Sequence, residues 1–172
     1  MSIPRQEKCE PHALVVMAHP APASLTRTVT AVVIEECEAL GHTTEISDLA
    51  AAGFDAVFGP ADHAAYAAGD PTPEDVLKEQ RRIDRADHLV IVYRVYWWSM
   101  PALLKGWIDR VFVSGWAFQE DAESGLVKKL GRLKVHLIAL GGADRVTYAK
   151  RGFRFSSSSC LTRRSSPTPR PP

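Results

Sequence analysis

The stretch VYRVYWWSMPALLKGWIDRVFVSGWAF, residues 92–118, decides the fold class of this chain. It starts inside an apolar run, His88–Tyr93, that predicts a buried strand, and it continues into three adjacent aromatic residues, Tyr96–Trp98. Pro101 then suits the first turn of a helix, because apolar residues recur at helical spacing from Leu103 to Val111. In open α/β sheets ligands bind beyond the carboxyl ends of the strands, so the aromatic residues mark a candidate site for a flat ligand.

The same alternation of strand and helix extends to both sides of this stretch. We expect a strand at 13–18, a helix at 24–40, a strand at 42–46, a helix at 73–86, a strand at 88–93, a helix from Pro101 and a strand at 135–140. The first strand is a continuous apolar run, as in strands that are buried on both faces of a parallel sheet. This order predicts an α/β protein, a three-layer sandwich around a parallel sheet. Residues 49–73 and 116–131 are expected to be connections, and the first is long enough for a functional loop or lid.

The length and charge of the chain predict one folded domain and a tail. A chain of 172 residues suits one domain with a proper core. Residues 1–144 contain 14 Lys and Arg against 20 Asp and Glu, whereas residues 145–172 contain seven Lys and Arg and no acid. Ser, Arg and Pro dominate after Gly152, and such a composition buries too little apolar surface to stay ordered. We therefore predict a domain at 1–152 and a disordered tail at 153–172.

Composition also limits the compartment and the classes of partner. Cys9, Cys37 and Cys160 show no spacing typical of metal ligands or disulfides, so a reducing compartment, the cytoplasm, and no metal are expected. The polar start predicts no signal peptide, and no apolar run approaches the roughly 18 residues of a membrane span. A net charge of +1 predicts no nucleic-acid partner. Glycine-rich dinucleotide and mononucleotide fingerprints are absent from the sequence.

Residues after the first strand are candidates for phosphate binding. His19 follows the strand directly, and Ser24 and Thr26 are residue types that cap helices well. The N-terminus of a helix offers unpaired N–H groups and a positive dipole to a phosphate. The alternative is that Ser24 only caps its own helix and that His19 only ends a loop.

Aromatic and glycine residues after the later strands are candidates for contact with a flat ring. Trp97 and Trp98 can stack on such a ring, or they can be core or interface aromatics. Gly141 and Gly142 allow close approach of the backbone, or they form a simple turn, and Tyr148 is a candidate hydroxyl donor. The charged run 78–85 is expected to be a solvated helix face.

Three motifs together give a family resemblance. They are AHPAPASLT at 18–26, YWWSMPALLKGWIDRVF at 96–112 with GWAF at 115–118, and the LGG and tyrosine pattern at 140–148. From about residue 12 to Gly152 the chain resembles the flavodoxin-like NAD(P)H:quinone oxidoreductases, the family of DT-diaphorase and the modulators of drug activity. The resemblance implies a flavodoxin-like sheet with strand order 2-1-3-4-5, and we expect the fifth strand to be missing here, which leaves the order 2-1-3-4.

The resemblance also implies an activity and a site. It implies an enzyme, an NAD(P)H dehydrogenase (quinone), that passes a hydride from NAD(P)H through a bound flavin, FAD rather than FMN, to quinones or similar planar acceptors. Members of the family are typically homodimers. By position, the flavin phosphate would be held by His19, Ser24, Leu25 and Thr26, and the ring would be lined by Val95, Tyr96, Trp97, Trp98, Gly141 and Gly142. Tyr148 would be catalytic, handling charge on the flavin during hydride transfer.

Two departures from the family pattern bear on activity. Arg94 stands where the family usually has proline, which predicts weaker flavin retention or a shifted reduction potential. Nothing after Gly152 resembles the family, so we expect either an active quinone reductase or a shortened relative of impaired activity. The alternative function is a flavodoxin-like regulatory or ancillary binding subunit with little or no redox activity.

Overall fold

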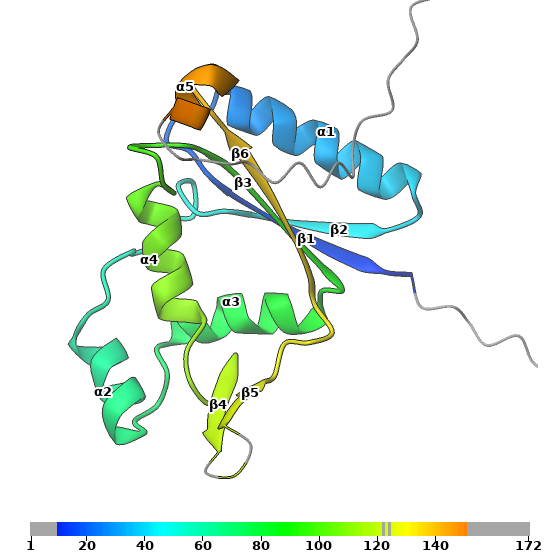
Figure 1. Ribbon diagram of the computed structural model, residues 1–172. Helices are drawn as coiled ribbons and strands as arrows, with labels where there is room; N and C mark the ends of the chain where they lie inside the picture. Colours follow the sequence, from blue (N-terminus) through cyan, green and yellow to red (C-terminus); the bar gives the residue numbers. More distant parts are fainter. Residues whose placement is uncertain (1–9, 122, 124, 151–172) are drawn as a thin grey trace, which may run out of the picture. The chain divides into compact units, whose positions relative to one another are not determined.

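The fold is built on a four-stranded parallel sheet with strand order β2-β1-β3-β6 (Figure 1). It was obtained as a computed structural model that describes residues 10–121, 123 and 125–150. The strands are β1 (His12–Ala18), β2 (Thr43–Asp48), β3 (His88–Arg94) and β6 (Lys134–Leu140). Every neighbouring pair in this sheet is parallel, which confirms the predicted α/β class and the predicted order of the first four parallel strands.

Helices cover both faces of the sheet and make three layers (Figure 1). Helix α1 (Leu25–Ala39) lies on one face, and α3 (Glu74–Arg85) and α4 (Ala102–Val111) lie on the other. Successive side chains of a strand point to opposite faces. Leu14 therefore packs in a buried cluster with residues of α3 and α4, while its neighbour Val15 packs in a second cluster with residues of α1.

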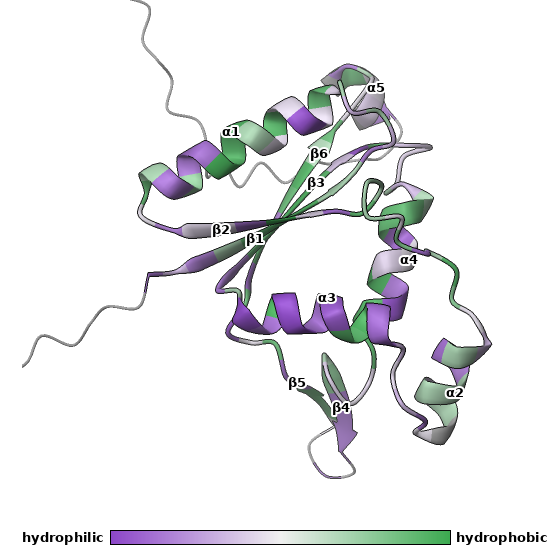
Figure 2. Cartoon of the chain, turned by 180° about the vertical axis from the view of Figure 1, so that it is seen from behind, coloured by the Kyte–Doolittle hydropathy of each residue, from purple (hydrophilic) through white to green (hydrophobic). Residues whose placement is uncertain are grey.

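Charged and polar residues of α3 do not all face solvent, although Figure 2 shows that the helix is mostly hydrophilic. Glu79 is only 4% exposed and accepts hydrogen bonds from Ser47 Oγ and Trp107 Nε1, both at 3.0 Å. A second carboxylate oxygen accepts from Arg82 Nη1 at 2.8 Å. The expectation of a fully solvated face for 78–85 was therefore wrong for Glu79, which joins β2, α3 and α4 through buried hydrogen bonds.

Both expected connections contain regular structure that the sequence pattern did not predict. Helix α2 (Pro60–Ala68) lies within 49–73, and a hairpin of β4 (Phe118–Asp121) and β5 (Gly125–Lys128) lies within 116–131. The helix has proline in its first turn, and the Asp62 carboxylate accepts from the backbone N–H of Gly59 at 2.8 Å. All four residues of β5 are exposed, so no alternation of buried and exposed residues marks this strand.

A buried arginine of α4 holds the 49–73 connection and α3 in place. Arg110 Nε donates to Asp62 at 2.8 Å, and Arg110 Nη1 donates to the carbonyl of Asp55 at 2.7 Å and to Asp75 at 2.5 Å. Burial alone would raise the pKa of the Asp75 carboxyl, but hydrogen bonds from Arg110 and its charge lower that pKa overall. These contacts fix α2 and α3 against α4, and α4 follows directly from the aromatic residues after β3.

The described residues fall into two compact units, which divide between Gly142 and Ala143. The second unit contains helix α5 (Arg145–Lys150), which includes a hydrogen bond from the Tyr148 N–H to the Asp144 carbonyl at 3.1 Å. The predicted domain boundary at residue 152 and the predicted tail lie outside the described residues and stay predictions. Within those residues, no helix is long and apolar enough to cross a membrane.

Close packing at one glycine of α4 gives a testable consequence. A Cβ added at Gly106 would lie 2.0 Å from the carbonyl oxygen of Ala56, so the connection approaches α4 where only glycine fits. We expect Gly106→Ala to lower the free energy of unfolding by about 1–3 kcal/mol, the usual cost of overpacking, in urea denaturation. Gly131→Ala is the control, because nothing lies within 4 Å of a Cβ added there. Equal unfolding midpoints for the two variants would contradict the close approach.

Candidate functional site

The carboxyl ends of three strands meet where the order of the sheet reverses. Strand β1 pairs with β2 along one edge and with β3 along the other, so the chain leaves β1 in one direction and returns on its other side. Ala18 pairs with Tyr93, and Arg94 pairs with Leu140, which brings the ends of β1, β3 and β6 side by side. This is the switch point at which open α/β sheets bind ligands.

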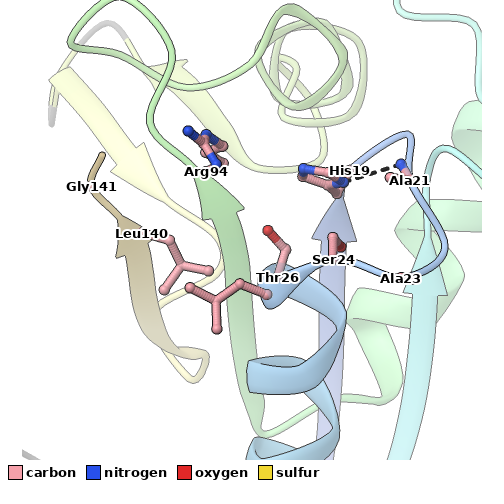
Figure 3. A pocket seen from close by; sticks show the side chains of 9 residues that line it. His19, Ala21, Ala23, Ser24, Thr26, Arg94, Leu140 and Gly141 are labelled. Atoms are coloured by element: carbon pink, nitrogen blue, oxygen red, sulfur yellow. Dashed lines mark hydrogen bonds between the residues drawn. The ribbon is translucent and has the colours of Figure 1, made fainter. Parts of the chain in front are cut away.

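A pocket of about 310 Å³ lies at this switch point (Figure 3). Its walls come from the loop after β1, the first turn of α1 and the ends of β3 and β6. The lining residues are His19, Ala21, Ala23, Ser24, Leu25, Thr26, Arg94, Leu140 and Gly141. The volume is at the lower end of the range for ligand sites.

The first turn of α1 presents free N–H groups to this pocket. Ser24 Oγ accepts from the N–H of Arg27 at 3.3 Å, and the Ser24 carbonyl accepts from the N–H of Thr28 at 3.1 Å. The N–H groups of Leu25 and Thr26 have no acceptor among the residues that the structure describes. Ser24 thus caps its own helix and also lines the pocket, so the two interpretations of this residue are compatible. The positive end of the helix dipole favours an anion here.

Two side chains add polar groups to the same wall. Thr26 is only 2% exposed, and its hydroxyl makes no hydrogen bond within the described part of the chain. Figure 3 shows the Thr26 oxygen on the side of His19 and Arg94. His19 Nδ1 accepts from the N–H of Ala21 at 3.1 Å, so a neutral imidazole carries its proton on Nε2. The hydroxyl oxygen reaches the pocket surface, where it can donate a hydrogen bond to a ligand oxygen.

The aromatic residues after β3 form a strained two-residue turn. Tyr96 and Ser99 exchange backbone hydrogen bonds of 3.0 Å in both directions, and Trp97 and Trp98 between them have φ values of 47° and 65°. Turns with two positive φ values usually contain Asn and Gly. Each bulky residue in this region costs on the order of 1–3 kcal/mol, and Trp97 is 94% exposed, so burial of its ring does not offset that cost. Such strain is typical of functional sites.

The structure brings together some of the predicted site residues and leaves others apart. The four predicted phosphate ligands and Gly141 line the pocket. Val95 to Trp98 follow β3 directly and Gly142 follows Gly141, so they lie at the same edge of the sheet without lining this pocket. Tyr148 lies in α5 of the second unit, and its catalytic role stays a prediction.

The site prediction omitted Arg94, Leu140 and two alanines that line the pocket. Arg94 ends β3 and Leu140 ends β6, so the carboxyl ends of the strands were the signal that could have found them. Among the described residues, no group of three or more His, Cys, Asp or Glu side chains could hold a metal ion.

Comparison with known proteins places this geometry in a family. Residues 11–163 match the family described as having a flavodoxin-like fold. The chain is 32% identical over 157 residues to ribosyldihydronicotinamide dehydrogenase [quinone] of Mus musculus, covering 81% of this chain and 67% of the relative. It superposes on the NAD(P)H:quinone oxidoreductase from Methanothermobacter marburgensis with a TM-score of 0.75 at 31% identity, covering 83% of this chain and 73% of that one.

A third similar protein has been solved with a bound ligand. General stress protein 14 of Treponema denticola, in complex with FMN, superposes with a TM-score of 0.53 at 27% identity. The alignment covers 80% of this chain and 66% of that protein. The match over residues 11–163 establishes that this chain belongs to the family with a flavodoxin-like fold.

Proposed function

We propose that this protein is a flavin-dependent NAD(P)H:quinone oxidoreductase. It would transfer a hydride from NAD(P)H through a bound flavin to quinones or similar planar acceptors. The observation that carries the proposal is the pocket at the β1/β3 switch point, where a free helix N-terminus and the unpartnered Thr26 hydroxyl lie at the same sheet edge as an exposed aromatic turn. The names of the relatives supply the reaction class.

The chemistry of the residues fits a flavin nucleotide, which joins a flat ring to a phosphate. The N–H groups of Leu25 and Thr26, the Thr26 hydroxyl and His19 Nε2 would donate to the phosphate, and Ser24 would hold the first turn of α1 in shape. Val95, the aromatic turn 96–98 and Gly141–Gly142 would line the ring. When bound, the flavin supplies the two-electron step between NAD(P)H and the acceptor.

The residues of the chain would orient the reactants and exclude water. Trp97 and Trp98 offer flat apolar surfaces on which a planar acceptor can lie, with little selectivity among acceptors. The Tyr148 hydroxyl would donate a hydrogen bond to developing negative charge on the ring. Burial raises the pKa of the Tyr93 hydroxyl at the end of β3, so this group stays neutral at physiological pH.

The proposal includes three finer points that rest on the family resemblance. They are FAD rather than FMN as the cofactor, a homodimer as the assembly, and the cytoplasm as the location. The isolated cysteines agree with a reducing compartment. The FMN bound to the stress protein keeps FMN as the alternative cofactor.

The proposed reaction is tested by an absorbance spectrum of the purified full chain, followed by anaerobic addition of NADPH and then menadione. We expect a flavin spectrum that bleaches with NADPH and returns with menadione, because the flavin carries both half-reactions. The same additions to protein-free flavin at equal concentration are the control. A colourless protein that stays inert with added FAD and FMN would contradict the proposal and favour the ancillary binding role.

Trp97 gives a second test, because its positive φ disfavours tryptophan at this position whereas the proposed stacking on the flavin ring requires an aromatic side chain. Trp97→Gly removes an exposed ring and suits the positive φ, so we expect the free energy of unfolding without flavin to be unchanged or raised by about 1 kcal/mol. The loss of ring stacking should raise the flavin dissociation constant about tenfold.

Tyr66→Ala is the matched control for Trp97→Gly. Tyr66 is another exposed aromatic residue, 60% accessible on α2, and it does not line the pocket. Urea denaturation gives the free energy of unfolding, and fluorescence titration gives the flavin affinity. A Trp97→Gly variant that is clearly destabilised but keeps its flavin affinity would show that Trp97 is structural.

A further inference from the structure

Arg94 lines the pocket at a position where the family usually has proline. It is the last residue of β3, and its side chain lines the pocket together with His19 and Thr26 (Figure 3). Its Nη2 lies 3.5 Å from the position that a Cβ would occupy at Gly142. The guanidinium thus fills the space beside a glycine that follows β6, and a side chain at that glycine would be in contact with it.

Arg94 is exposed and has no counter-charge among the residues that the structure describes. Six of the described arginines form ion pairs with carboxylates: Arg27, Arg81, Arg82, Arg85, Arg110 and Arg132. Arg94 forms none with any residue that the structure describes, and no acidic residue lines the pocket. A guanidinium keeps its charge at all physiological pH values. The pocket therefore combines a permanent unpaired cation with the positive end of α1.

We propose that Arg94 is a ligand of the flavin phosphate, opposite the N-terminus of α1, and that it makes this protein select phosphorylated flavins over riboflavin. This inference rests on the proposed function. A guanidinium presents paired N–H donors that match the geometry of a phosphate. Arg94 shares its pocket with the free N–H groups of α1, whereas the aromatic turn assigned to the ring does not line it. The expected consequence is tighter cofactor retention, the opposite of the sequence-based expectation for arginine at this position.

The test compares full-length variants by flavin fluorescence titration with FMN and with riboflavin, at low and high salt. Arg94→Gln should raise the dissociation constant for FMN about tenfold, reduce its salt dependence and leave the constant for riboflavin unchanged. Arg94→Lys should lie between, because it keeps the charge and loses the paired donors. Arg81→Gln is the control for net charge, since it removes an exposed, ion-paired arginine on α3 and should change neither constant.

The outcomes separate this inference from the proposed function. The phosphate role is overturned if Arg94→Gln leaves the affinity for FMN unchanged. It is also overturned if Arg94→Gln and Arg94→Lys each weaken the affinity for FMN and the affinity for riboflavin to the same extent. In both cases the protein still binds flavin, so the proposed function stands. If the wild-type chain binds no flavin, the proposed function fails, and inorganic pyrophosphate becomes the probe. A pyrophosphate-induced rise in thermal unfolding temperature that is lost in Arg94→Gln supports the anion site, and equal behaviour of the two proteins overturns it.

Discussion

The central place of β1 in the sheet determines where its neighbouring strands and the candidate site lie. Ala13 to Met17 are fully buried because the strand has β2 and β3 on its edges and helices on its faces. Strands β2 and β3 pair in parallel with opposite edges of β1, so the chain runs to one side of β1 and then crosses to the other. The loop after the carboxyl end of β1 therefore places His19 and the first turn of α1 near the end of β3. A buried apolar strand thus positions a polar, anion-binding wall.

Residues at this edge depart from what is usual for their residue types. Trp97 and Trp98 adopt positive φ values, the Thr26 hydroxyl has no partner in the described chain, and the exposed Arg94 has no counter-charge there. The buried Arg110, by contrast, is paired with Asp62 and Asp75. Departures of this kind concentrate where a structure serves binding rather than its own stability.

The sequence predicted the features that depend on local pattern and missed those that depend on tertiary contact. Apolar runs and helix signals were sufficient for the parallel α/β class and for placing Ser24 and Thr26 at the start of α1, whereas the strand order came from the family resemblance. The burial of Glu79 was not predictable, because its partners Ser47 and Trp107 come from other elements. Likewise, no sequence pattern shows that Arg94 lacks a carboxylate partner, since this depends on every element around the pocket.

A titration of isotope-labelled protein with FMN, followed by the backbone amide resonances in two-dimensional ¹H–¹⁵N NMR spectra, would locate the phosphate site directly. We expect the N–H groups of Leu25 and Thr26 to shift the most within α1, because they are the free donors of its first turn. Shifts confined to other segments, such as α2 or the β4–β5 hairpin, with these two amides unchanged, would contradict it.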